Sequence, residues 1–389
     1  MGTKGSDTRL VLMICILATL IVICFTLSTL NANEYLTENF GSTCMDLIPY
    51  ATTTKYPLIP DAIFVSVASY RDDECKDTIT SIYDNADEPD KIYVGICEQN
   101  KDASTEKCLV PEKYMKNARI KSMNYLEAKG PTYARYWCST LWRGEEYFLQ
   151  IDSHTQFQKN WDTNVKKMYK QCLEESPKPI LTHYPATKEQ LAIGGSPEMC
   201  NGKVTDNQIP SFLAGWTGES PIPKKSPKPM AAAGFKFLRG DFLYEVPYDP
   251  NMPHVFVGEE VLLSARLWTH GWDYYTPNIK VCSHHYGRKE KVKYWDDLKD
   301  GYKCRAKAEK RILFMLGLLG KDKVESDFLR DHHRYGFGKV RTLGEYWLAM
   351  GVDFEKKTLE DWCNDAKPSK KFEGWNFKLD GYKKIKKYT

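Results

Sequence analysis

Several common sequence signatures are missing from this chain. Its 12 cysteines contain no Cys-x-x-Cys spacing, so structural zinc is not expected, and the His-Glu-x-x-His segment of zinc hydrolases is absent. No Walker-type glycine loop occurs, which disfavours ATP-driven phosphoryl transfer. The 55 basic residues are nearly balanced by 51 acidic ones, so the net charge of +4 leaves no strong footprint for nucleic acid. We therefore expect no nucleic-acid partner.

One long apolar run lies near the N-terminus. Residues 10–30 are all apolar or small, which is enough to cross a hydrocarbon core of about 30 Å as a helix. Lys4 and Arg9 precede this run, and no further cation follows before Lys55, so the short N-terminus is expected in the cytoplasm. The sequence thus predicts a type II transmembrane anchor, with the membrane as a partner.

This anchor divides the rest of the chain. Residues 1–9 would be a cytoplasmic tail, and the polar, threonine-rich residues 31–57 would be a stem that holds the remainder off the bilayer. We expect the remainder in the lumen of the Golgi or endoplasmic reticulum, where the ten cysteines outside the anchor could form disulfides. The absence of any Asn-x-Ser/Thr sequon argues mildly against that location.

The chain is organised around residues 147–157, YFLQIDSHTQF. An apolar run of strand length ends there in Asp152, Ser153 and His154, as when a buried strand delivers polar groups to the rim of a sheet. Asp152 and His154 point the same way in an extended segment, and a carboxylate and an imidazole can share one divalent cation. A strand end with a hydrogen-bonded Asp and a surface His would give the same pattern.

The flanking segments predict an α/β fold. Continuous apolar runs at 62–68 and 91–97, and a shorter one at 119–123, alternate with helical patterns, which indicates a largely parallel sheet. Ligands of such sheets bind beyond the carboxyl ends of the strands. Residues 185–229, rich in Pro, Gly, Ser and Lys, are expected to form a long surface loop.

Several later residues are candidates for a site. Arg135, one turn into the next helix, could reach an anion over the sheet edge or simply pair with a neighbouring carboxylate. Glu259 and Glu260 open a helix after a glycine, where the helix dipole favours acids whatever the function. His284 and His285 supply a further imidazole. The small residues of 230–237 permit a ligand to approach the backbone, although a tight helix contact would explain them equally well.

These groups favour one kind of chemistry. Asp152, His154 and a histidine from 284–285 make a site of one carboxylate and two imidazoles with open positions. Mn²⁺ or Mg²⁺ completed by a diphosphate fits such a site, because a metal that bridges two phosphates neutralises charge on a departing nucleoside diphosphate. The expected chemistry is the departure of UDP or GDP from an activated sugar.

An ordered set of blocks adds a resemblance. Residues 119–162 resemble the retaining polypeptide N-acetylglucosaminyltransferases that modify hydroxyproline, through Gly130-Pro131, Ala134-Arg135, LQIDSH at 149–154 and Trp161-Asp162. Residues 66–72 (SVASYRD) and the blocks at 335–338 and 351–354 are also similar to that family. More distantly, residues 229–235, 258–260 and 282–288 resemble the mucin-type N-acetylgalactosaminyltransferases. The resemblance covers roughly residues 60–355.

The resemblance implies a GT-A fold over residues 58–292, followed by a helical C-terminal extension over residues 293–389. Asp152 and His154 would bind metal and diphosphate, with Ser153 at the same cofactor site. His285 would complete the metal shell, but the shorter Cys-to-His spacing leaves His284 as a rival. The remaining implied contacts are the nucleotide with Ser69, Tyr70 and Arg71, the sugar with Ala232 and Ala233, and the donor sugar or acceptor hydroxyl with Glu259 or Glu260. Cytoplasmic members of the family lack an anchor, so the acceptor stays open.

We therefore predict a metal-dependent, retaining transfer of a sugar, with UDP-GlcNAc favoured, to a protein hydroxyl such as that of Ser, Thr or hydroxyproline. In a front-face reaction Arg135 or Arg288 would hold the developing UDP charge, and the departing phosphate oxygen would take the acceptor proton. Double displacement through Glu259 or Glu260 is an alternative. The same residues would also suit an inverting enzyme on a glycan acceptor, with Glu260 as its base, or an inactive, membrane-tethered protein that binds carbohydrate.

Overall fold

A computed structural model of the chain describes residues 44–45, 54–102 and 104–363. The chain divides into two units, Met1–Leu47 and Ile48–Thr389, and all the elements below belong to the second. The predicted tail and anchor, and most of the predicted stem, lie outside the described residues. Across the described ranges, no helix has the length and apolar character needed to cross a membrane.

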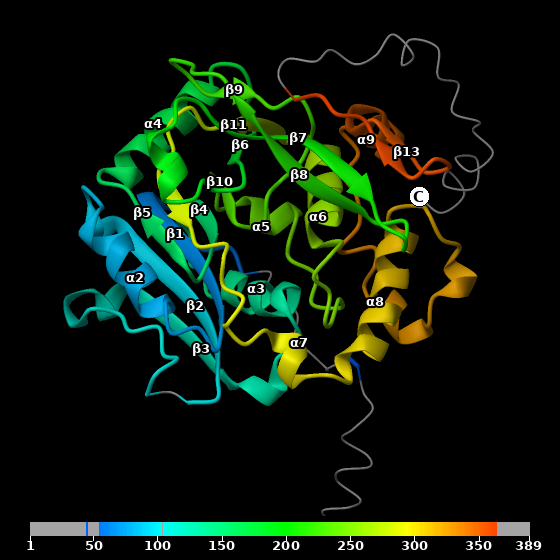
Figure 1. Cartoon of the computed structure of the whole chain (residues 1–389), viewed down its shortest axis with the longest axis horizontal. Coiled ribbons are helices and arrows are strands. Elements are labelled where there is room, and N and C mark those ends of the chain that lie inside the picture. The colour runs from blue at the N-terminus through cyan, green and yellow to red at the C-terminus, as the bar shows by residue number, and fades with distance from the viewer. Residues whose placement is uncertain (1–43, 46–53, 103, 364–389) are drawn as a thin grey trace, which may run out of the picture. The chain divides into compact units, whose positions relative to one another are not determined.

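The second unit is built on a mixed sheet of eight strands in the order β3-β2-β1-β4-β10-β6-β11-β9 (Figure 1). Its strands are β1 Ile59–Tyr70, β2 Ile92–Asn100, β3 Ala118–Asn124, β4 Glu145–Asp152, β6 Pro179–Thr182, β9 Lys224–Lys225, β10 Phe235–Arg239 and β11 Asp273–Thr276. The four strands β3, β2, β1 and β4 are parallel, which confirms that part of the prediction. Strand β10 runs antiparallel between β4 and β6, so the sheet is more mixed than expected.

The two faces of the sheet follow from the alternation of apolar side chains along its buried strands. Ile63 and Val65 of β1 face helices α2 (Cys75–Asp84) and α4 (Trp161–Cys172). Phe64, between them, faces the opposite layer, where it packs with α3 (Pro131–Ser139) and α6 (Glu259–Thr269). Helices on both faces therefore bury the central strands and leave their carboxyl ends as the place for polar groups.

A second, two-stranded sheet lies near that edge. Strand β5 (Thr155–Phe157) follows β4 directly and pairs antiparallel with β12 (Cys282–His284), so that Thr155 is opposite His284. This pairing brings a segment from late in the chain beside the end of β4.

The prediction of a long surface loop over residues 185–229 is wrong. This range contains an antiparallel hairpin of β7 (Ser196–Val204) and β8 (Pro210–Thr217), in addition to β9. Four of the seven prolines in this range follow β8, whereas Pro197 lies within β7 and Pro210 begins β8. A disulfide between Cys200 and Cys363 ties the hairpin to the C-terminal part of the described chain.

Helical segments dominate the chain beyond the core sheet. They include α7 (Tyr294–Asp297), α8 (Gly301–Met315) and α9 (Leu343–Met350), with a small pairing of β13 (Val352–Asp353) and β14 (Thr358–Leu359). The remaining elements are α5 Phe242–Glu245, η1 Pro89–Lys91, η2 Glu112–Asn117, η3 Tyr125–Glu127, η4 Glu189–Ala192, η5 Lys321–Lys323 and η6 Ser326–Leu329. Besides the disulfide at the hairpin, Cys75 pairs with Cys108, while Cys97, Cys138, Cys172 and Cys282 are buried thiols.

Candidate functional site

Asp152 is the last residue of β4 and stands beside the end of β1, where it pairs in register with Ala68. Its carboxylate accepts a hydrogen bond of 2.8 Å from Arg135 Nη2 and lies 3.1 Å from His284 Nε2. Burial opposes ionisation of Asp152, but the contacts with His284 and Arg135 outweigh burial and lower its pKa well below the usual range. Asp152 is therefore an ionised carboxylate at the sheet edge.

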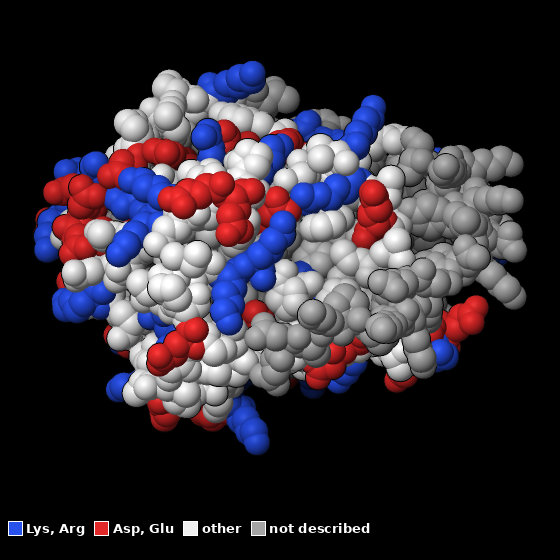
Figure 2. All heavy atoms as spheres, turned by 90° about the horizontal axis from the view of Figure 1, so that it is seen from above, with Lys and Arg blue, Asp and Glu red and all other residues white. Residues whose placement is uncertain are grey.

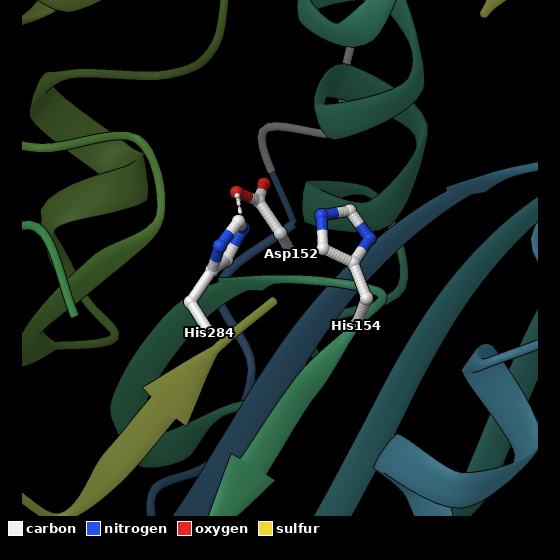
Figure 3. Close-up of side chains that lie close together, drawn as sticks. All are labelled: Asp152, His154 and His284. Atoms are coloured by element: carbon white, nitrogen blue, oxygen red, sulfur yellow. Dashed lines mark hydrogen bonds and ion pairs between the residues drawn. The ribbon is translucent and has the colours of Figure 1, made fainter. Parts of the chain in front are cut away.

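Asp152, His154 and His284 converge on one point (Figure 3). Each offers one ligand atom, and the three atoms all lie within 4.8 Å of one another. The two imidazole rings have centroids 4.5 Å apart. His285 instead extends to Glu74, 3.0 Å away, and its side chain is 53% exposed. The structure thus brings together the predicted Asp152 and His154 with His284, and not with His285.

These residues fit a divalent cation of the Mn²⁺ or Mg²⁺ kind. One carboxylate and two imidazoles leave room in the coordination shell, and oxygen-rich completion by a diphosphate suits these metals. Gly234 keeps the adjoining space clear, because a Cβ atom there would lie 3.3 Å from Asp152 Oδ2. In addition, Nδ1 of His284 is buried without a hydrogen-bond partner among the described residues.

Asp72 is a central residue of the site for which the sequence predicted no role. Its carboxylate accepts a hydrogen bond of 2.6 Å from Ser153 Oγ and lies 2.9 Å from His154 Nδ1. Burial opposes its ionisation, but the contact with His154 helps to lower its pKa. Its position two residues after β1, within the SVASYRD block, was the available signal.

Arg288 also binds the Asp72 carboxylate. Its Nη2 donates to Asp72 at 2.7 Å, its Nε donates to Glu74 at 3.2 Å, and its Nη1 lies 2.5 Å from His154 Nδ1. The predicted anion-binding arginine thus reaches the site from a segment more than 130 residues beyond His154.

Arg135 joins Asp152 to the start of α6. Its Nη1 lies 2.5 Å from Glu259 Oε2, in addition to its bond with Asp152. Burial alone would lower the pKa of this guanidinium, but the charges of Glu259 and Asp152 raise it. Arg135 therefore pairs with neighbouring carboxylates, which was one of the two alternatives for this residue. It lies beside Asp152, His154 and His284.

Glu260 does not bind Arg135; it contacts Tyr184 and the backbone of Ala233, which follows the hairpin. Its carboxylate accepts hydrogen bonds of 2.6 Å from Tyr184 Oη and 2.7 Å from the Ala233 amide. Burial raises the pKa of Glu260 to about 7, although both hydrogen bonds act in the opposite direction. Ala233 and Glu260, each predicted separately to lie at the sugar, are thus in direct contact. The amide of Ala232 donates to Thr182 Oγ1. No role was predicted for Tyr184.

The predicted nucleotide-contacting residues lie at the end of β1. Tyr70 Oη donates to Asp297 at 2.7 Å, and Arg71 binds the same carboxylate at 2.6 Å. Ser69 is buried, and its Oγ has no hydrogen-bond partner among the described residues. Tyr70 and Arg71 thus engage α7, and a nucleotide contact for the three residues stays a prediction.

Comparisons with known proteins place the chain in a family. The sequence matches a family model described as "Glycosyltransferase (GlcNAc)" over residues 62–122 and 112–356. Among curated proteins none gives a significant match.

Solved structures give weak similarities. The GalNAc-T7 structure with UDP, GalNAc and Mn²⁺ is 14% identical, with a TM-score of 0.44, over 70% of this chain and 55% of that chain. The structure of S. aureus TarS 1-349 with UDP-GlcNAc is 14% identical, with a TM-score of 0.40, over 76% of this chain and 81% of that chain. The family match covers far more than half of the sequence and includes every candidate site residue. The chain therefore belongs to the GlcNAc glycosyltransferase family.

Proposed function

We propose that this glycosyltransferase moves GlcNAc from UDP-GlcNAc to a hydroxyl group of a polypeptide, with a divalent metal ion and with retention of the anomeric configuration. The observation that carries the proposal is the convergence of Asp152, His154 and His284 at the end of β4 (Figure 3). The family description supports the choice of GlcNAc. Membership in a transferase family disfavours the alternative of a protein that only binds carbohydrate.

Three residues would hold the metal. Asp152 would supply a carboxylate oxygen, and His154 and His284 would each supply a ring nitrogen, with the remaining positions left for the diphosphate. When bound, Mn²⁺ or Mg²⁺ would neutralise negative charge on the departing UDP.

Two arginines would act on the same diphosphate. Arg135 and Arg288 carry guanidinium groups within 3 Å of site carboxylates, and both side chains are largely buried. Fixed cations in a site with little water stabilise developing charge more strongly than they would in bulk solvent. Glu259 orients Arg135 through their 2.5 Å contact, so we assign it a positioning role.

Glu260 separates the two mechanisms that remain. In the front-face route the departing phosphate oxygen takes the acceptor proton, and Glu260 only holds the Ala233 backbone in place. In an inverting enzyme it would be the general base, and its pKa of about 7 lies in the range that suits such a base. The anomeric configuration of the product distinguishes the two routes.

We also propose that residues 10–30 anchor the protein in the membrane with the catalytic unit in the lumen of the Golgi or endoplasmic reticulum. The apolar run and the cations before it support this proposal. The disulfides between Cys75 and Cys108 and between Cys200 and Cys363 suit an oxidising compartment.

The test is donor turnover by the full-length chain with Mn²⁺, across a panel of UDP- and GDP-sugars, with and without a chelator. We expect UDP-GlcNAc to be consumed only with metal, and NMR of the product to reveal an α-linkage, as in the donor. Asp152→Asn should abolish turnover, whereas Asp241→Asn, at an exposed ion pair with Arg239, should not. Turnover that survives both chelation and Asp152→Asn would contradict the proposed metal site, and a β-linked product would favour the inverting alternative.

A further inference from the structure

Two large aromatic side chains are exposed side by side. Phe256 is 58% exposed and Trp295 is 44% exposed, and their ring centroids lie 5.6 Å apart with the planes at 81°. Nearly perpendicular rings form a corner, here called the aromatic corner, that is open to solvent. Clustered exposed aromatics are unusual on a soluble surface and typically mark binding sites.

One side of the aromatic corner is fastened to the sheet. Trp295 belongs to α7, whose Asp297 accepts hydrogen bonds of 2.7 Å from Tyr70 Oη and 2.6 Å from Arg71 Nη1. Tyr70 ends β1, the strand beside Asp152, so α7 is attached at the carboxyl edge of the sheet. Figure 1 shows α7 next to α3 at this end of the molecule.

The segment before Phe256, on the other side of the aromatic corner, is hydrogen-bonded to the start of α3. The His254 amide donates to the Lys129 carbonyl at 2.5 Å, and Thr132 Oγ1 donates to the Val255 carbonyl at 3.2 Å. Gly130 permits this approach, because a Cβ atom there would lie 3.1 Å from His254 Cα and 3.4 Å from Tyr294 Cζ. Its φ of 83° also favours glycine.

Phe256 of the aromatic corner lies close in sequence to the candidate site. Phe256 lies three residues before Glu259, whose carboxylate contacts Arg135, and Arg135 in turn binds Asp152. A molecule that rests on the two rings is therefore held next to the elements that carry the proposed metal and diphosphate site.

The chemistry of the corner selects its occupant. Phe256 has no polar atom, and Trp295 offers a single N–H donor and no acceptor. The adjoining Val257, 37% exposed, adds further apolar surface. A sugar could pack a C–H face on one ring, but the corner offers its hydroxyl groups only one hydrogen-bond donor with which to fix their orientation. An aliphatic or prolyl side chain needs no hydrogen bond and can pack against both rings.

We infer that the aromatic corner is an acceptor subsite, which binds an apolar side chain of a polypeptide close to the residue whose hydroxyl receives the sugar. This inference rests on the proposed function. It adds that residues flanking the acceptor hydroxyl determine which polypeptide segments are used.

The test uses the full-length chain, UDP-GlcNAc and Mn²⁺ with synthetic peptides. Each peptide has a central Ser, Thr or hydroxyproline, and its neighbours are apolar in one half of the set and Gly or Ser in the other. The variants are Phe256→Ala and Trp295→Ala, with Tyr244→Ala as the matched control. Tyr244 is also an exposed aromatic, at 42%, but it belongs to α5 and contacts Tyr56.

We expect the wild type to prefer peptides with apolar neighbours. Trp295→Ala should raise the KM for those peptides about tenfold and remove the preference. The KM for UDP-GlcNAc should change much less, and Tyr244→Ala should behave as the wild type.

Three results would overturn the inference: transfer to oligosaccharides alone, an unchanged peptide preference in both corner variants, or an equal rise in the KM for donor and peptide. Absence of turnover of any donor would contradict the proposed function instead. In that case, fluorescence polarisation tests separately whether the aromatic corner binds the peptides, because this measurement needs no turnover. Binding that is weakened by Trp295→Ala and not by Tyr244→Ala would support the subsite, and equal binding by all variants would refute it.

Discussion

Asp72 illustrates how a single buried carboxylate can prepare a metal ligand. It lies 2.9 Å from His154 Nδ1 and receives the Ser153 hydroxyl at 2.6 Å. A carboxylate on one ring nitrogen of a histidine fixes the ring and leaves the other nitrogen for a metal. We therefore assign Asp72 the role of positioning His154.

This role predicts the effect of Asp72→Asn. The Kd for Mn²⁺, measured by calorimetry, should rise by about 10- to 100-fold, as for other outer-shell partners of metal ligands. Asp73→Asn is the matched control, because Asp73 is half exposed and pairs with Lys291. Equal Mn²⁺ affinities of the wild type and the Asp72 variant, or equal losses in both variants, would contradict the role.

Glu260 predicts a pH dependence of stability. Its pKa is raised from 4.5 to about 7, so the folded protein holds the proton more tightly than the unfolded chain. The resulting stabilisation is complete below the unfolded pKa and is lost as pH rises through the folded pKa. Relative to Glu260→Gln, the wild type should lose about 2 kcal/mol of unfolding free energy between about pH 5.5 and about pH 8.5.

Urea denaturation of both proteins at the two pH values measures this difference. Tyr184→Phe should enlarge the loss, because it removes a hydrogen bond that favours the ionised carboxylate. A difference between wild type and Glu260→Gln that is the same at both pH values would show that Glu260 does not titrate in this range.

At the scale of elements, strand pairing decides which histidine enters the site. In β12, His284 is opposite Thr155 of β5, and successive side chains of a strand point to opposite sides. His284 therefore faces Asp152 while His285 reaches toward Glu74. The spacing of the sequence alone could not distinguish them, because the pairing joins segments that lie far apart in the chain.

Gly234, just before β10, leads to a prediction about UDP binding. Gly234 leaves open the space in front of Asp152, and a Cβ atom there would lie 3.3 Å from Oδ2. Gly234→Ala should weaken UDP binding in the presence of Mn²⁺ by about tenfold or more, because small displacements in a preorganised site are costly. Its free energy of unfolding should change by less than about 1 kcal/mol.

Gly218→Ala is the control for this variant, since a Cβ atom at Gly218 would have no neighbour within 4 Å. Calorimetry of UDP binding and urea denaturation separate the two effects. Unchanged UDP affinity in Gly234→Ala would mean that the space in front of Asp152 is not used by the ligand.

At the scale of the whole molecule, the sequence predicted the parts of the fold that depend on local pattern. The parallel strands β1 to β4 follow from continuous apolar runs, and α4 and α6 follow from helical periodicity. The direction of β10 and the hairpin of β7 and β8 could not be predicted in this way. An apolar run carries no information on strand direction, and the prolines nearby concealed the paired strands.

The residues of the candidate site also differ in whether local sequence pattern could predict them. Asp152 and His154 were found because Asp152 ends a buried strand and His154 follows it by two residues. Asp72 and Tyr184 were missed because their roles arise only from contacts with segments more than 70 residues away. The surface adds no strong field of one sign, since Lys and Arg are interspersed with Asp and Glu over the described face in Figure 2.

The central claim is that Asp152, His154 and His284 form a metal site that binds the diphosphate of UDP. The most direct test is calorimetry of UDP binding to the full-length chain, with Mn²⁺ and with a chelator, for the wild type and Asp152→Asn. We predict that chelation or the substitution weakens UDP binding at least about tenfold, as expected when a charged ligand contact is lost. UDP affinity that is the same with and without metal, in both proteins, would contradict the claim.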